Sequence, residues 1–441
     1  MRRLNIGAPE RLVVLAAAVA LAAGACSSAA KSPPSDTTAA PTATPRTGQT
    51  TPDTNREVAD VLVVRTTSGG FDIVFGGNGE TMFELPRGAA SQRWQSVATA
   101  DAAETSTTVR VLRGEGGDVD SETTLPGSWR LPSIGLAGTA GGLSANGKIL
   151  VLEQGQAGTT SDRRTKFAIV DASGARKPHV ITLDGSFSFD TLSPDGSWLY
   201  LIEHASNGGP SYQVRRASVS TGRLDETVIV DKRNIDEVMQ GDAVTQLASA
   251  HGWVYTLYRG EDGAFVHALD TVNGGAFCID LPDTDGEDDA AVAGWGLALD
   301  PRGSSLYAAN AETGQVMKID LGEFVVARQG SIPRQVGAVE LAKFENGEWA
   351  AAGSAAVDSK GAVLFVAGDA GVAAVRTNDL TLLTRLDAGH SYKSVGVGGS
   401  GTVYGVDSHG GLVRLGTLSD PSVQPMSMSR YASIEGVMTL R

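Results

Sequence analysis

Short apolar runs separated by small polar turns dominate residues 60–441. Each run has roughly four to eight residues rich in Val, Ile, Leu, Tyr and Phe, and a turn of Gly, Asp, Asn or Ser follows it. Residues 198–203 and 402–406 are examples, whereas helical spacing of apolar positions is nearly absent. Runs of this length between turn residues are typical of β-strands. The pattern therefore predicts an all-β fold.

One phrase recurs along the chain: a small or apolar strand ends in a tight turn, and a second β-rich strand follows. The clearest copies contain S-P-D-G at residues 193–196 and D-P-R-G at residues 300–303. Including weaker copies, the turn glycines lie at intervals of 40 to 58 residues, and they are Gly147, Gly196, Gly252, Gly303, Gly361 and Gly401. A repeat of this length with about four strands is the size of a β-propeller blade.

The turn glycines predict six blades, and residues 60–132 contain enough strands for one or two more. We expect a single propeller of seven blades, with eight as the alternative, closed by pairing of residues 433–440 with the first strands. Closure removes the free sheet edges on which other chains could pair. If the blades are equivalent, Gly196, Gly303 and Gly361 occupy the same turn. Leu192, Leu299 and Val357 then point into equivalent inter-blade space, and Trp198, Leu306 and Leu364 pack on neighbouring strands.

The N-terminus has the pattern of an export signal. Arg2, Arg3 and Arg11 precede an apolar stretch at residues 12–22, which is too short for a membrane span of ~20 residues. The small residues Ala23-Gly24-Ala25 before Cys26 resemble the lipobox of bacterial lipoproteins, although that family usually has leucine where this chain has Ala23. The resemblance implies cleavage after residue 25 and acylation of Cys26. The alternative is an ordinary signal peptide that leaves Cys26 as a thiol.

Residues 26–56 follow as a predicted tether. The segment is rich in Ser, Thr and Pro and has no aromatic residue, Leu or Ile, so it lacks the apolar surface that offsets ordering entropy. Its composition also permits O-glycosylation. The expected organisation is therefore a signal peptide at 1–25, an acylated cysteine and disordered tether at 26–56, and the propeller at 57–441. Cys278 is the only other cysteine, so acylation of Cys26 excludes an internal disulfide.

The charge of the chain excludes some partners. The whole chain carries −14, and the signal segment contains three arginines and one glutamate, so the mature part is near −16. A surface this acidic disfavours nucleic acid and anionic lipid. Attachment to the membrane is therefore expected through the lipid on Cys26, at the extracytoplasmic face.

The phrases S-P-D-G before W-L-Y and L-D-P-R-G before L-Y-A-A-N resemble those of bacterial seven-bladed propellers of the lactonase and quinoprotein-dehydrogenase-like superfamily. The resemblance extends over most of residues 60–441 and implies an architecture. It implies no activity, because enzymes and non-enzymes share these motifs. The family's site residues have no one-to-one match here, so none is carried over.

Several local motifs resemble parts of known ligand-binding or metal-binding sites. Residues 396–401 match G-x-G-x-x-G, but a strand follows instead of the helix that a dinucleotide site needs, so a turn between strands is expected. The acidic residues 283–289 have the alternate oxygen spacing of a calcium loop without the rest of the EF-hand pattern; a solvated loop is the preferred interpretation. Trp295 is expected to pack between blades, with a ligand contact as the alternative, and Cys278 to pack as a small apolar residue on an outer strand.

The six histidines show no zinc-ligand spacing; they are His179, His204, His251, His267, His390 and His409. No nucleophile elbow is present either. The sequence therefore predicts no catalytic residue, no metal ligand and no cofactor, and it leaves the ligand-binding residues unknown.

Two functions remain. The preferred one is a monomeric lipoprotein whose propeller binds an envelope protein, a glycan or a small ligand, since a tethered module with rigid blades presents loops for recognition. The alternative is an extracytoplasmic lactonase-like hydrolase or propeller dehydrogenase with its site in the central channel.

Overall fold

The computed structural model describes residues 60–135, 138–154, 164–205, 211–235, 239–260, 263–284, 291, 294–334, 353–428 and 434–440. The chain divides into two units, Met1–Asn55 and Arg56–Arg441, and all described residues belong to the second. The predicted signal segment, Cys26 and the tether lie outside the described residues. Within the described part of the chain, no helix is long and apolar enough to cross a membrane.

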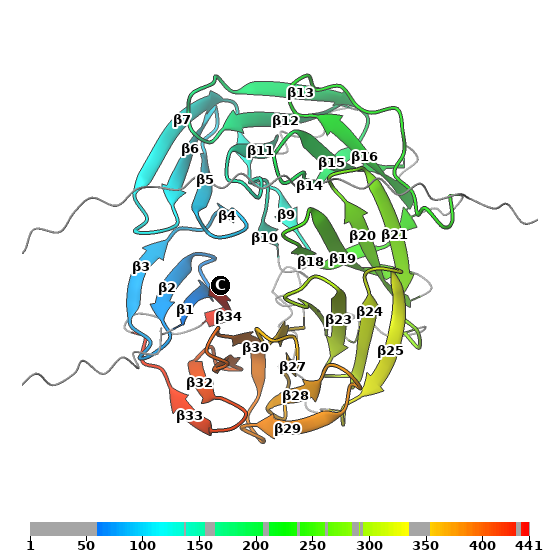
Figure 1. Cartoon of the computed structure of the whole chain (residues 1–441). Coiled ribbons are helices and arrows are strands. Elements are labelled where there is room, and N and C mark those ends of the chain that lie inside the picture. The colour runs from blue at the N-terminus through cyan, green and yellow to red at the C-terminus, as the bar shows by residue number, and fades with distance from the viewer. Residues whose placement is uncertain are drawn as a thin grey trace, which may run out of the picture. The chain divides into compact units, whose positions relative to one another are not determined.

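The strands form eight four-stranded antiparallel sheets, arranged in a ring (Figure 1). The fold is thus an all-β propeller with eight blades, which we number in chain order. The expectation of seven blades is wrong and the alternative of eight is correct, because the residues before Pro132 supply strands for two blades and the start of a third.

The first four blades contain the following strands, given from the inner to the outer edge of each sheet. Blade 1 has β34 (Ile434–Leu440), β1 (Val61–Thr66), β2 (Phe71–Phe75) and β3 (Thr81–Leu85). Blade 2 has β4 (Ala89–Ala90), β5 (Ser96–Ala102), β6 (Ser106–Arg113) and β7 (Val119–Pro126). Blade 3 has β8 (Trp129–Arg130), β11 (Ile149–Gln154), β12 (Arg164–Asp171) and β13 (His179–Asp184). Blade 4 has β14 (Phe187–Leu192), β15 (Trp198–His204), β16 (Ser211–Ser218) and β17 (Met239–Gln240).

The other four blades follow the same order. Blade 5 has β18 (Asp242–Ala248), β19 (Trp253–Gly260), β20 (Gly263–Asp270) and β21 (Gly275–Asp280). Blade 6 has β22 (Trp295–Leu299), β23 (Ser305–Asn310), β24 (Gln315–Asp320) and β25 (Val325–Ser331). Blade 7 has β26 (Ala355–Val357), β27 (Val363–Val366), β28 (Val372–Arg376) and β29 (Leu382–Leu386). Blade 8 has β30 (Tyr392–Val397), β31 (Val403–Asp407), β32 (Leu412–Gly416) and β33 (Pro421–Pro425).

The two ends of the propeller domain close the ring. The C-terminal strand β34 pairs antiparallel with β1, from Val61 opposite Leu440 to Thr66 opposite Ile434, which confirms the predicted pairing of residues 433–440. Asp60 adds a second link, to the first turn of blade 8: its Oδ2 accepts hydrogen bonds from the hydroxyls of Ser400 at 2.7 Å and Tyr404 at 3.0 Å. Closure therefore depends on both ends of the domain.

The predicted turn equivalence is confirmed. Gly196, Gly303 and Gly361 lie between the first and second strands of blades 4, 6 and 7, with φ of +75°, +69° and +70°. Each amide donates to the carbonyl three residues earlier, at 2.9, 2.8 and 3.0 Å respectively. A Cβ is strained at such φ values, which is why glycine recurs here.

Inter-blade packing agrees with the prediction except at one residue. Leu192, Leu299 and Val357 each belong to an apolar cluster shared with the preceding blade, and so do Leu306 and Leu364. Trp198 instead packs into the cluster between blades 4 and 5. It follows its turn glycine by two residues, whereas Leu306 and Leu364 follow theirs by three, and a one-residue shift moves a side chain to the other face of a strand. The true equivalent is Leu199, which is fully buried between blades 3 and 4.

Candidate ligand-binding site

A short hairpin interrupts the inner strand of blade 3. After β8 the chain forms β9 (Ser133–Ile134) and β10 (Thr139–Ala140), and the blade resumes where Leu143 bridges Leu150. Figure 1 shows this hairpin in the middle of the ring. Arg65 of blade 1 donates to the Thr139 hydroxyl at 3.1 Å, and a Cβ added to Gly135 would lie 2.7 Å from a carbonyl oxygen of β18 in blade 5. The hairpin therefore spans the central channel.

A cavity of about 630 Å³ lies beside this hairpin. Its walls come from β8, β9 and β11 of blade 3, β14 to β16 of blade 4, and β18 and β19 of blade 5. Small-molecule sites typically measure 300–1,000 Å³ and are lined by apolar groups with a few placed polar ones. Here Ile134, Phe189 and Ile202 supply apolar surface between polar side chains.

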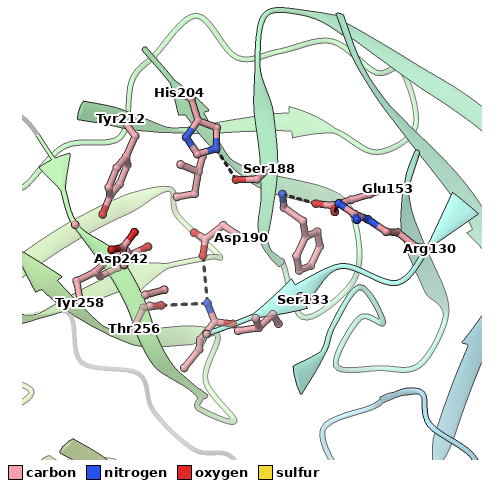
Figure 2. Close-up of a pocket in the computed structure, with 17 residues that line it drawn as sticks. Arg130, Ser133, Glu153, Ser188, Asp190, His204, Tyr212, Asp242, Thr256 and Tyr258 are labelled. Carbon is pink, nitrogen blue, oxygen red and sulfur yellow. Dashed lines mark hydrogen bonds and ion pairs between the residues drawn. The ribbon is translucent and has the colours of Figure 1, made fainter. Parts of the chain in front are cut away.

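Asp190 is the most deeply buried acid in the cavity wall. It lies in β14 at a β-bulge, since the register with β15 shifts between Phe189 and Thr191, and bulges redirect a side chain. The Asp190 side chain faces the cavity in Figure 2, and the residue is only 6% exposed. Its Oδ1 accepts a hydrogen bond from Gln246 Nε2 at 3.1 Å, and the same amide donates to the Thr256 hydroxyl at 3.1 Å. Burial raises the pKa of Asp190 to about 6.

Two further polar pairs line the wall formed by blades 3 and 4. Glu153 Oε1 accepts the backbone N–H of Phe189 at 3.0 Å, and its Oε2 lies 3.6 Å from Arg130. His204 Nε2 lies 2.9 Å from the Ser188 hydroxyl. Both pairs join adjacent strands or blades, so they fix the polar edge of the cavity (Figure 2).

Two tyrosines form the wall toward blade 5. The rings of Tyr212 and Tyr258 lie 5.8 Å apart with a tilt of 31°, and both residues are buried. Burial raises the pKa of each phenol above its ordinary value, so both stay neutral. The Tyr212 hydroxyl is buried, and a hydrogen-bonding interaction with Tyr258 partly offsets the rise of its pKa. Asp242, at the rim, pairs with Arg259 at 2.5 Å.

The candidate motifs of the sequence lie outside this cavity. Residues 396–401 form the end of β30 and the turn before β31, as expected for a turn between strands. Trp295 is fully buried between blades 5 and 6, which confirms inter-blade packing rather than a ligand contact. Cys278 is buried on β21, the outer strand of blade 5, beside Met239, as predicted.

The acidic loop and the histidines form no shared site in the described structure. Of residues 283–289 only Asp283 and Thr284 are described, and the other five lie outside the described residues. The histidines are spread over blades 3, 4, 5, 7 and 8, and only His204 lines the cavity. Among the residues that the structure describes, no three His, Cys, Asp or Glu side chains are placed to hold a metal ion.

The cavity residues were not predicted from the sequence, although one of them, Asp190, departs from the pattern of the repeat. Aligning the blades on their turn glycines places Asp190 opposite Leu297 of blade 6 and Ala355 of blade 7, but opposite Gln246 of blade 5. Polar residues at this position in the adjacent blades 4 and 5, which hydrogen-bond each other, mark a departure from the repeat. Such departures at inner strands are where a site is expected.

Comparisons with known proteins support the fold alone. No protein-family model matches the chain, and no curated protein matches it. Among solved structures, Citrobacter koseri AztD is 11% identical with a TM-score of 0.53, over 86% of this chain and 97% of that one. The dihydro-heme d1 dehydrogenase NirN is 13% identical with a TM-score of 0.50, over 86% of this chain and 74% of that one. The described chain therefore shares the β-propeller fold of these proteins.

Proposed function

We propose that this protein is a lipid-anchored, extracytoplasmic binding module whose propeller takes a small ligand into the cavity beside the central hairpin. The observation that carries the proposal is the cavity itself. It combines a suitable volume with a buried acid whose hydrogen-bond partner is the neutral amide of Gln246. The fold does not need such an acid in its interior, because burying a carboxylate without a cation costs free energy of folding.

The anchoring part of the proposal rests on the N-terminal sequence. A basic start, a short apolar stretch and small residues precede Cys26, and a lipid on that cysteine would hold the tether of about 30 residues to the membrane. At ~5–6 Å × √n such a tether spans roughly 30 Å. This length lets the module sample ligand away from the lipid headgroups.

A blocking variant tests the binding role. Ser133 is exposed and lines the cavity, so Ser133→Trp fills the mouth without disturbing the core. The matched control is Ser331→Trp, at an exposed position on the outer strand β25. Full-length protein in detergent is screened by ligand-observed NMR against a small-molecule library. We expect hits that Ser133→Trp abolishes and Ser331→Trp retains; hits unaffected by Ser133→Trp, or a screen without hits, would contradict a role for the cavity.

Fractionation tests the anchor. Cys26→Ser should move the protein from the membrane to the soluble fraction or leave it unprocessed, because the thioether to diacylglycerol needs sulfur. Intact mass of the wild-type N-terminus should show the added lipid. An unmodified Cys26 with unchanged membrane retention would exclude the lipoprotein. Chemical conversion of a bound hit would instead support the enzymatic alternative.

A further inference from the structure

We propose that the ligand of this cavity is a small organic cation whose ammonium group pairs with Asp190. The inference rests on the proposed function, because it assumes that the cavity is a binding site, and it adds the chemical class of the ligand. Three features carry it: the pairing of the lining charges, the tyrosine rings, and the apolar wall.

The first feature is a carboxylate without a cation. Glu153 has Arg130 as its partner and Asp242 has Arg259. Asp190 is more buried than either, yet the hydrogen bond that its Oδ1 accepts comes from the neutral amide of Gln246. A buried carboxylate is stabilised mainly by a cation or several hydrogen bonds. A ligand ammonium would supply the missing positive charge.

The second feature is the pair of tyrosine rings. Tyr212 and Tyr258 line the same cavity as Asp190 (Figure 2). The face of an aromatic ring attracts a cation electrostatically. These rings therefore favour a cationic ligand over a neutral one of the same shape.

The third feature separates an organic cation from a metal ion. Ile134, Phe189 and Ile202 line the cavity next to the polar groups, and its volume of about 630 Å³ far exceeds what a single ion needs. A ligand with a carbon body covers this apolar wall while its ammonium group reaches Asp190. A neutral polyol would leave the Asp190 charge unpaired, and an anion would be repelled by that charge.

The same geometry predicts a pH dependence. Asp190 must be ionised to hold the cation, and burial sets its pKa at about 6, so binding should weaken as pH falls through 6. The charged or titratable groups around it are Arg130 on β8, Glu153 on β11, His204 on β15, Tyr212 on β16, Asp242 on β18 and Tyr258 on β19. A His204→Gln variant separates the contribution of the His204 imidazole from that of Asp190.

Calorimetry with matched probes tests the inference. Benzylamine, benzyl alcohol and benzoate share one skeleton and differ in charge, and spermidine extends the amine series. Full-length protein in detergent is titrated at pH 7.5 and pH 5. We expect an amine to bind at pH 7.5, with weaker or no binding of the alcohol and benzoate. Affinity should fall about tenfold or more in Asp190→Asn, and also at pH 5 in both wild type and His204→Gln.

The control is Asp120→Asn, which removes the same charge from an exposed position on β7 in blade 2. It should bind the amine as the wild type does. If benzyl alcohol or benzoate binds as tightly as the amines and Ser133→Trp blocks that binding, the cation inference fails while the proposed function stands. If no amine binds, or if Asp190→Asn binds the amine as well as wild type, the inference is overturned.

Discussion

Replacing Asp190 by Asn should make the propeller more stable at neutral pH, in contrast to its expected effect on binding. Asn keeps the shape of the side chain and the oxygen that accepts the Gln246 hydrogen bond, but it carries no charge. The variant therefore removes the desolvation cost of the carboxylate and leaves the packing of β14 in place. A residue kept for function at the expense of stability is expected to behave in this way.

The pKa of Asp190 gives the magnitude and the sign. Burial raises it from 3.8 to about 6 in the folded protein. Between these values the folded state binds more protons than the unfolded state, so stability falls as pH rises through this window. One pKa unit corresponds to ~1.4 kcal/mol, so the loss is about 3 kcal/mol and is complete above pH ~7. Asn does not titrate, so the variant avoids this loss.

Urea unfolding followed by tryptophan fluorescence measures the effect at pH 4, 5, 6 and 7.5. The free energy of unfolding of Asp190→Asn, minus that of wild type, should increase by about 2.4 kcal/mol from pH 4 to pH 7.5, because the rest of the effect develops below pH 4. Asp120→Asn should show no such trend, because that side chain is exposed on β7. A difference that stays constant with pH, or that decreases, would refute the assignment of Asp190 as a buried acid without a cation.

Three further predictions concern the fold. Leu192→Ala should lower the free energy of unfolding by about 2–5 kcal/mol, because Leu192 is 7% exposed between blades 3 and 4. The control Leu383→Ala, at a position 40% exposed, should change it by less than about 0.5 kcal/mol. Equal losses in the two variants would contradict the inter-blade packing. A chain starting at Glu57 should show a cooperative thermal transition, whereas one starting at Leu62 lacks Asp60 and its link to blade 8 and should melt at a lower temperature by calorimetry. Asp195 accepts hydrogen bonds from Ser193 and Ser197 in its turn, and these bonds lower the pKa of its carboxyl. Asp195→Ala should therefore lower the free energy of unfolding in urea by about 1 kcal/mol at pH 7. This loss should shrink as pH falls below 4, since the protonated carboxyl accepts these bonds less well.

The repeat made most of the fold predictable. In blades 3 to 8 a tight turn with a positive-φ glycine leads into the second strand, so glycine recurs at a fixed place and the strands can be located from it. The preferred count of seven blades was wrong because blades 1 and 2 have no such turn glycine. Blade 1 also takes its inner strand, β34, from the other end of the domain. The error at Trp198 has a different cause, since β-strands have a period of two and a shift of one residue exchanges their faces.

The cavity was not predictable from the same regularity because it depends on departures from it. The hairpin at residues 133–140 interrupts the inner strand of blade 3 and reaches across the channel to blades 1 and 5, and the bulge in β14 directs Asp190 toward the space that results. Neither feature follows from the local sequence, because the hairpin needs surfaces more than 70 residues away in the chain, and the bulge is defined only against its partner strand. In a propeller the repeat therefore predicts the scaffold, and the positions where one blade differs from the others indicate where a ligand can bind. In this chain the clearest such position is Asp190, a carboxylate that aligns with Leu297 and Ala355 in other blades.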